Sequence, residues 1–194
     1  MVPMMSEPKK RKPRADALRN REHILAVARE AYAGGESTVT LEEIVRRSGV
    51  GVGTLYRHFP TRDALVEALY RSELEKLVDA EKDLAERLTP IEALRAWMLL
   101  FIDLMATKMI LREAMSTLVG GPDELYAASG EMIRRTVNDL VERAIAANEI
   151  HMVNEPIDLL RAISGVANSS PGPNWEDSAR WLVDVLIAGV RVRG

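Results

Sequence analysis

Apolar residues recur every three or four positions along most of this chain, and no stretch alternates as a β-strand does. Capping residues and glycine or proline breaks divide the pattern into nine predicted helices. Their approximate bounds are 16–32, 40–48, 51–59, 61–88, 89–107, 108–119, 123–148, 155–167 and 174–192. The pattern therefore predicts an all-α fold.

Several of these helices have recognisable start signals. Thr40 with Glu43 has the spacing of a capping box, and Thr89 with Glu92 repeats it, with proline at the first helical position. Thr61 can cap the fourth helix, and Asn174 with Asp177 can cap the ninth. In the first helix one face should be buried, formed by Leu18, Leu25, Ala28 and Tyr32.

Composition is that of a globular protein with an ordinary core. Apolar residues make up 47% and charged residues 28%, and with no cysteine the chain has neither disulfides nor thiolate nucleophiles. No apolar run reaches the roughly 18–20 residues that span a bilayer, and no signal peptide is visible. We therefore expect a cytoplasmic protein with no membrane partner.

Charge is distributed unevenly along the chain. Residues 1–60 contain 11 Lys and Arg against 7 Asp and Glu, whereas residues 61–194 contain 15 against 22. A basic front end on an acidic body suits a protein that presents one end to a polyanion. Residues 1–13, which include the basic run Lys9–Lys12, should be disordered in the free protein. This tail could contact DNA or simply be solvated, and the sequence favours neither role.

The segment 51–59 has an unusually sparse outer face. On a helical wheel Val52, Leu55 and Phe59 fall within about 60° and should be buried. Opposite them lie Gly53, Thr54 and Arg57, flanked by Tyr56 and His58. A helix that enters the DNA major groove needs such a low face with a few base-reading groups, and flanking groups that reach phosphates.

Each of these residue types has a distinct use against DNA. Gly53 permits close approach, Thr54 offers a hydroxyl and a methyl, and Arg57 can pair bidentately with guanine. Tyr56 and His58 suit phosphate oxygens. Thr40 and Arg62 add polar groups at two helix starts, where free backbone N–H groups attract phosphate.

Residues 16–70 closely resemble the DNA-binding domain of TetR-type (TetR/AcrR) transcriptional regulators. The resemblance rests on the sequences Thr40-Leu-Glu-Glu-Ile, Ser48-Gly-Val-Gly-Val-Gly-Thr-Leu-Tyr-Arg-His-Phe59 and Pro60-Thr-Arg-Asp-Ala-Leu65. It implies a helix-turn-helix domain over 14–60 and an effector-binding and dimerisation domain over 61–194, with 61–88 as the connecting helix. By position, Thr40, Thr54, Tyr56, His58 and Arg62 match the usual DNA contacts of the family. The family often reads bases from the position of Val52, which conflicts with its predicted burial.

The last two predicted helices are apolar on more than one face. Trp181, Val185 and Ala188 lie on the side of the ninth helix opposite its main apolar stripe. Such helices are either deep core or meet a partner, and the resemblance favours a homodimer with a four-helix interface. Interface residues would include Leu160, Ile163, Ala167, Leu182, Leu186 and Val190. A two-fold dimer requires a palindromic double-stranded operator.

The remaining helices should enclose a small-molecule effector. Large, adaptable side chains are available at Trp97, Phe101, Met105, Met109 and Met115, with plain core packing as the alternative for each. Lys108, Arg112 and Arg135 could face an anionic ligand, and Tyr126 and Thr136 could supply hydroxyls. The Met-rich, aromatic-poor lining favours a mainly apolar organic effector.

Catalytic patterns are missing from the sequence. His23, His58 and His151 share no ligand spacing, and no metalloprotease, hydrolase or phosphate-loop motif occurs, so we expect no enzyme, cofactor or metal. The favoured interpretation is a ligand-released transcriptional repressor. A small-molecule carrier or enzyme with a vestigial DNA-binding end, and a transcriptional activator, are the alternatives.

Overall fold

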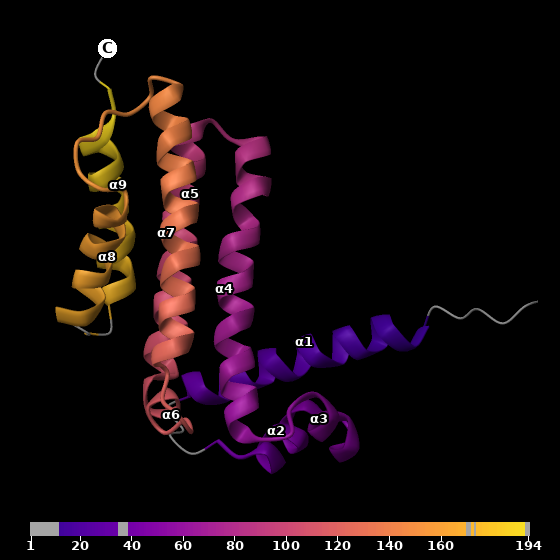
Figure 1. The fold of residues 1–194 in the computed structure, drawn as a ribbon. Coiled ribbons are helices and arrows are strands. Elements are labelled where there is room, and N and C mark those ends of the chain that lie inside the picture. Colours follow the sequence, from indigo (N-terminus) through magenta and orange to yellow (C-terminus); the bar gives the residue numbers. More distant parts are fainter. Residues whose placement is uncertain (1–11, 35–38, 170–171, 173, 193–194) are drawn as a thin grey trace, which may run out of the picture. The chain divides into compact units, whose positions relative to one another are not determined.

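The computed structural model describes residues 12–34, 39–169, 172 and 174–192. This part of the chain forms nine α-helices and no extended strand, which confirms the predicted all-α fold (Figure 1). The helices are α1 (Lys12–Ala33), α2 (Leu41–Ser48), α3 (Val52–His58), α4 (Arg62–Arg87), α5 (Pro90–Ile110), α6 (Arg112–Ser116), α7 (Asp123–Ala146), α8 (Ile157–Ser169) and α9 (Trp175–Val190). None of the described helices is long and apolar enough to cross a membrane.

The chain divides into two compact units, with the boundary between Leu69 and Tyr70 inside α4. The first unit contains α1, α2, α3 and the start of α4, and the second contains the rest of α4 and α5–α9. The functional division expected at residues 60 and 61 remains a prediction. The predicted basic tail lies almost wholly outside the described residues.

The core of the first unit is built from one face of each short helix. Its buried side chains include Ile24, Leu25, Ala28, Tyr32, Leu41, Ile44, Leu55, Phe59 and Leu65. Leu18, which was expected on the buried face of α1, is instead 56% exposed. It lies nearly two turns before Ile24, the first buried residue of the described side chains, so α1 extends past its packing partners.

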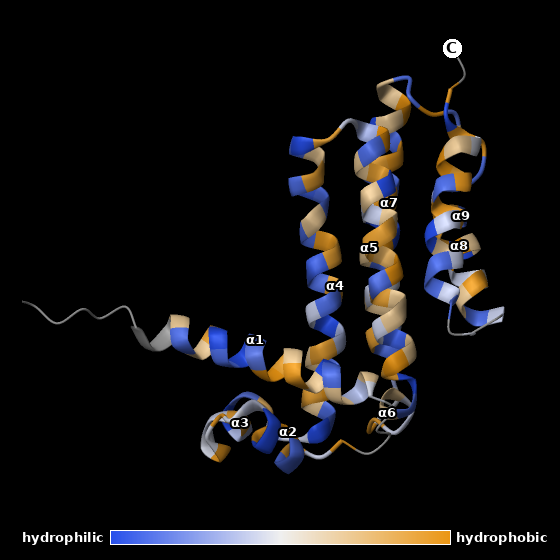
Figure 2. Cartoon of the chain, turned by 180° about the vertical axis from the view of Figure 1, so that it is seen from behind, coloured by the Kyte–Doolittle hydropathy of each residue, from blue (hydrophilic) through white to orange (hydrophobic). Residues whose placement is uncertain are grey.

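In the second unit, α5 is the central helix and packs against α7, α8 and α9. Hydrophobic residues follow α5 along most of its length (Figure 2). Trp97 is fully buried, its indole N–H donates a hydrogen bond to the Leu77 carbonyl at 2.8 Å, and its ring stacks near Phe101. Because both its apolar surface and its polar atom are satisfied internally, Trp97 holds α5 to α4 within this unit.

The predicted caps are present in part. Thr89 and Glu92 form the expected capping box. The Thr89 backbone N–H donates to the Glu92 carboxylate at 3.1 Å, and the Thr89 hydroxyl makes a further hydrogen bond to the same oxygen at 2.9 Å. The Thr40 hydroxyl accepts from the Glu43 N–H at 3.2 Å, but the Glu43 carboxylate pairs with Arg46 and Arg47, which lowers its pKa to about 2. Asn174 makes no side-chain hydrogen bond at the start of α9, contrary to its predicted capping role.

Candidate functional site

A glycine turn joins α2 to α3 in the first unit. Gly49 has φ of 66°, a left-handed conformation that favours glycine, and its N–H closes α2 on the Val45 carbonyl at 3.0 Å. A ring nitrogen of His23 lies 3.0 Å from the Ser48 carbonyl oxygen. This contact ties the middle of α1 to the turn, so α1 braces the α2–α3 pair.

The inner face of α3 is shorter than the sequence predicts. Leu55 and Phe59 are buried as expected, but Val52 is 59% exposed, so its predicted burial was wrong. Val52 is the first residue of a seven-residue helix, where the chain has just left the turn, and only later residues reach the core. Its methyl groups are therefore accessible, which removes the conflict with the base-reading position of the resembled family.

The outer face of α3 carries the predicted DNA-contacting groups. Gly53, Tyr56 and Arg57 are exposed, and Thr54 and His58 are half-buried. Arg57 makes no hydrogen bond or ion pair with any residue that the structure describes. A guanidinium left without an internal partner remains available for bidentate recognition of a base edge.

Gly53 has no internal reason to be glycine. A Cβ built there meets no atom within 4 Å, and its backbone φ lies outside the left-handed region. Glycine within a helix costs about 0.5–1 kcal/mol relative to alanine. A side chain at this position would therefore extend into open space on the outer face of α3, with no contact to the rest of the unit.

We expect Gly53→Ala to separate stability from DNA binding. The free energy of unfolding should rise by about 0.5–1 kcal/mol because alanine favours the helix. Operator affinity should fall roughly tenfold, because the added methyl crowds a close contact at a cost of about 1–2 kcal/mol. Thermal unfolding and band-shift titration measure the two effects; unchanged affinity would show that DNA does not approach Gly53.

Tyr56 is connected to the start of α2. Its hydroxyl donates a hydrogen bond of 2.8 Å to a carboxylate oxygen of Glu42, an exposed residue two positions after Thr40. Hydrogen bonds from its own backbone N–H and from Tyr56 keep the pKa of Glu42 below its ordinary value. Glu42 is therefore charged at neutral pH. It accepts the hydrogen bond that the Tyr56 hydroxyl could otherwise donate to a DNA phosphate.

Glu42→Gln should strengthen DNA binding without regard to sequence. A negative charge near a phosphate is repelled by about 1 kcal/mol at 4 Å in water, so we expect an affinity increase of roughly fivefold. Band shifts at two salt concentrations should show a larger gain at low salt. The matched control is Glu30→Gln, which removes the same charge from the exposed surface of α1. Weaker binding by the Glu42 variant would instead assign Glu42 to holding Tyr56 in place.

Thr40, Thr61 and Arg62, which lie at the starts of α2 and α4, differ in their surroundings. Thr40 is exposed, and its hydroxyl oxygen accepts from the Glu43 N–H. The Thr61 hydroxyl caps α4 as predicted, accepting from the Ala64 N–H at 3.1 Å. Arg62, in the first turn of α4, places its guanidinium carbon 6.0 Å from the centre of the Tyr32 ring, which fixes part of its side chain within the unit.

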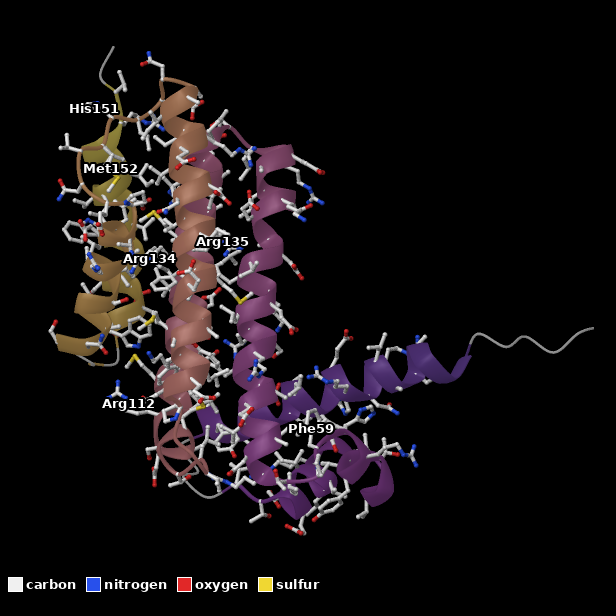
Figure 3. All side chains as sticks on the ribbon, viewed as in Figure 1. Phe59, Arg112, Arg134, Arg135, His151 and Met152 are labelled. Carbon is white, nitrogen blue, oxygen red and sulfur yellow. The ribbon has the colours of Figure 1, made fainter. Side chains whose placement is uncertain are left out.

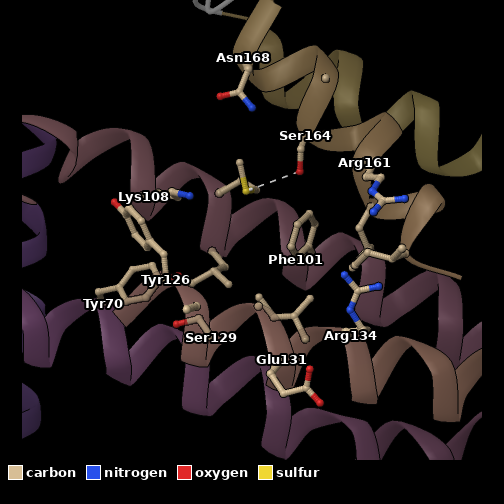
Figure 4. A pocket seen from close by; sticks show the side chains of 18 residues that line it. Tyr70, Phe101, Lys108, Tyr126, Ser129, Glu131, Arg134, Arg161, Ser164 and Asn168 are labelled. Atoms are coloured by element: carbon tan, nitrogen blue, oxygen red, sulfur yellow. Dashed lines mark hydrogen bonds between the residues drawn. The ribbon is translucent and has the colours of Figure 1, made fainter. Parts of the chain in front are cut away.

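The second unit contains a pocket of about 680 Å³, a volume within the range of small-molecule sites. Its lining comes from α4, α5, α7 and α8 (Figure 4). Four residues that the sequence offers as effector contacts, Phe101, Met105, Lys108 and Tyr126, line it together, and so does Leu160, which is predicted at the dimer interface. Lining residues that the sequence did not single out include Tyr70, Glu131, Arg134, Arg161, Ser164 and Asn168.

The other predicted effector contacts lie outside this lining. Trp97 and Met115 are buried in the core, and the Thr136 hydroxyl donates to the Met132 carbonyl at 3.0 Å within α7. Arg135 is exposed on α7 and lies 3.8 Å from Glu131 (Figure 3). The half-buried Met109 and the exposed Arg112 are also outside the lining.

The predicted interface residues divide into two groups. Leu160, Ile163 and Ala167 are buried within the unit, since α8 packs on α5 and α9, so they have no surface left for a partner. Leu182, Leu186 and Val190 are half-buried. The exposed apolar surface of α9 is instead formed by Trp181 (68% exposed), Val185 (43% exposed) and Ala188. The spacing of these three places them on one side of the helix.

In the part of the chain that the structure describes, acidic and imidazole side chains do not gather into a metal site. Within the described residues, no group of three or more His, Asp or Glu is arranged to hold a metal ion.

A helix-turn-helix with an exposed outer face on its second helix, followed by an all-helical unit with a pocket, is the architecture of a DNA-binding transcriptional regulator. The family model for bacterial regulatory proteins of the tetR family matches residues 24–69. A solved TetR transcriptional regulator from Streptomyces coelicolor is 37% identical, with a TM-score of 0.76 over 90% of this chain and 99% of that one. The chain belongs to the TetR family.

Curated relatives agree on this class. An HTH-type transcriptional regulator of Staphylococcus aureus is 39% identical over 83 residues, 41% of this chain and 44% of that protein. The HTH-type transcriptional repressor KstR of Rhodococcus jostii is 28% identical over 136 residues, 70% of this chain and 63% of that protein. The chain thus spans about half to two thirds of the lengths of these relatives.

Proposed function

We propose that this regulator is a repressor that binds a palindromic operator as a homodimer and is released by a small, mainly apolar organic effector. The observation that carries the proposal is the outer face of α3, where Arg57 and Gly53 are exposed without an internal role. Repression is favoured by the relatives named as repressors, among them KstR. DNA would be read by Val52, Gly53, Thr54 and Arg57, with phosphates held by Thr40, Tyr56, His58 and Arg62.

Dimerisation is supported by the exposed apolar side of α9. A soluble monomer rarely leaves a Trp and a Val exposed next to each other on one helix face. Self-association of α9 would bury this side, and the two-fold symmetry would place two reading heads on successive major grooves, about 34–36 Å apart. The half-buried Leu182 and Leu186 border the same face.

Effector control is supported by the pocket and by the course of α4. Tyr70 lines the pocket, and Arg62 begins the same helix eight residues earlier. An effector that shifts α4 would change the separation of the two reading heads. A hundredfold preference of the effector for the unbound conformation contributes about 2.7 kcal/mol to release.

Band-shift titration on the DNA upstream of the protein's own gene tests the proposal. We expect saturable binding to a fragment with an inverted repeat, with affinity that falls steeply as salt is raised. Weak binding that is blind to sequence would favour the carrier or vestigial-enzyme alternative. A reporter gene that is switched on by the protein, rather than off, would establish an activator.

A further inference from the structure

The charges around the pocket are balanced at one end and unbalanced at the other. Three cationic side chains line it: Lys108, Arg134 and Arg161. Arg161 lies 2.7 Å from Asp158 and 3.6 Å from Glu155, and Arg134 lies 4.0 Å from Glu155. Lys108 has no carboxylate within 4.0 Å among the described residues. Figure 4 shows the two arginines on one side of Phe101 and Lys108 on the other.

Lys108 is held over an aromatic ring instead. Its ammonium nitrogen lies 4.0 Å from the centre of the Tyr126 ring, which in turn meets Tyr70 edge-on at 5.6 Å. The face of an aromatic ring attracts the lysine ammonium group but is a weak hydrogen-bond acceptor. The three N–H donors of Lys108 can therefore still bind a ligand. The lysine is therefore positioned by the protein without being neutralised by it.

The surroundings of Lys108 add to this imbalance. The side chain is half-buried, and burial together with the positive charge of Arg112 lowers its pKa. Arg112 also has no carboxylate partner among the described residues. Two neighbouring cations, one partly removed from water, create a local positive potential that an incoming anion would relieve.

Between the charged ends, the lining combines apolar side chains with the polar residues Ser129, Ser164 and Asn168 and the carboxylate of Glu131, which lies 3.8 Å from Arg135. Phe101, Leu104, Met105, Ile133 and Leu160 contribute to its lining. The apolar part of this surface can bind the hydrocarbon portion of a ligand, and the cation at one end favours a ligand with an anionic head group.

We propose that the pocket takes an amphipathic carboxylic acid, whose carboxylate pairs with Lys108 while its apolar body lies along Phe101, Met105 and Leu160. The proposal rests on the function of this pocket as the effector site, and adds a negative charge to the mainly apolar effector. An amine would meet the positive charge of Lys108 and Arg112. A neutral alcohol would leave that charge uncompensated.

Three probes of equal chain length test the head group: dodecanoate, 1-dodecanol and dodecylammonium, each below its self-association concentration. Calorimetric titration of the full chain without DNA should show dodecanoate binding about tenfold tighter than 1-dodecanol, the scale of one charge-assisted hydrogen bond. Dodecylammonium should bind weakest. In Lys108→Met, which keeps an apolar side chain of similar length, dodecanoate should lose this advantage.

Two further variants separate a specific pairing from a loss of structure or of general charge. Lys108→Arg should restore most of the preference for dodecanoate, because it restores a cation at the same place. Lys82→Gln removes a charge from an exposed lysine of α4 and should leave the preference unchanged. Failure of dodecanoate to bind, wild-type preference for either other probe, or tight dodecanoate binding by Lys108→Met would each overturn the proposal.

Band shifts distinguish this failure from failure of the proposed function. A protein that binds its operator but ignores dodecanoate refutes the acid-binding pocket alone. A protein that binds dodecanoate through Lys108 but binds no DNA fragment refutes the repressor and leaves the pocket standing.

Discussion

Val185→Glu should convert the protein from a dimer into a monomer. The substitution places a charge in the exposed apolar side of α9, next to Trp181, which is the surface proposed to be covered by a second copy. Burying an unpaired carboxylate in an interface costs several kcal/mol, so the dissociation constant should rise by at least about a hundredfold. Sedimentation velocity measures the change, and operator affinity should fall with it because one half-site is lost.

The matched control is Met132→Glu on α7. Met132 is 41% exposed, close to the 43% of Val185, so both changes place a charge at a similar degree of exposure. The Met132 variant should sediment as the wild type does. If the Val185 variant remains dimeric at low micromolar concentration, α9 is not the interface.

Arg57→Ala should relax operator selectivity at one base pair in each half-site. Arg57 is exposed and without an ion pair among the described residues, so it can form the bidentate contact to guanine that discriminates bases by about 1–3 kcal/mol. Affinity for the best operator should fall by that amount. Affinity for operators altered at the guanine position should change little. The measurement is a band-shift panel in which each base pair is replaced in turn.

Tyr56→Phe provides the comparison for Arg57→Ala. It removes the hydroxyl assigned to a phosphate, together with its hydrogen bond to Glu42, and leaves the base-reading groups in place. Binding should therefore weaken by a similar factor across the whole panel. Indistinguishable selectivity profiles for the two variants would refute the division between base reading by Arg57 and phosphate binding by Tyr56.

Local signals predicted the helices well because they act within a few residues. The Thr89 box and the Thr61 cap form as the sequence indicates. Val52 was misjudged because a helical wheel treats the first residue of a helix like any other, whereas no turn of helix precedes it. Leu18 was misjudged because amphipathicity cannot show how far a helix extends beyond its neighbours.

The pocket was harder to predict than the reading face. Residues of α3 lie within one turn-helix segment, so their spacing alone places them together. Arg134 and Arg161 are far apart in the chain, and on a helix each is indistinguishable from a solvated charge. Trp97 is large and apolar like Phe101, yet its hydrogen bond to Leu77 holds it in the core. Only the packing of α5, α7 and α8 separates lining from core.

The end of α9 is attached to the segment that follows α7. An antiparallel bridge pairs Ile150 with Arg191, with hydrogen bonds from the His151 N–H to the Val190 carbonyl and from the Val192 N–H to the Glu149 carbonyl. The helix that lines the pocket through residues 126–134 is therefore joined near its C-terminal end to the helix that carries Trp181. If α9 forms the proposed dimer interface, a ligand that moved α7 would also act on that interface, and the dimer dissociation constant would then depend on occupancy of the pocket.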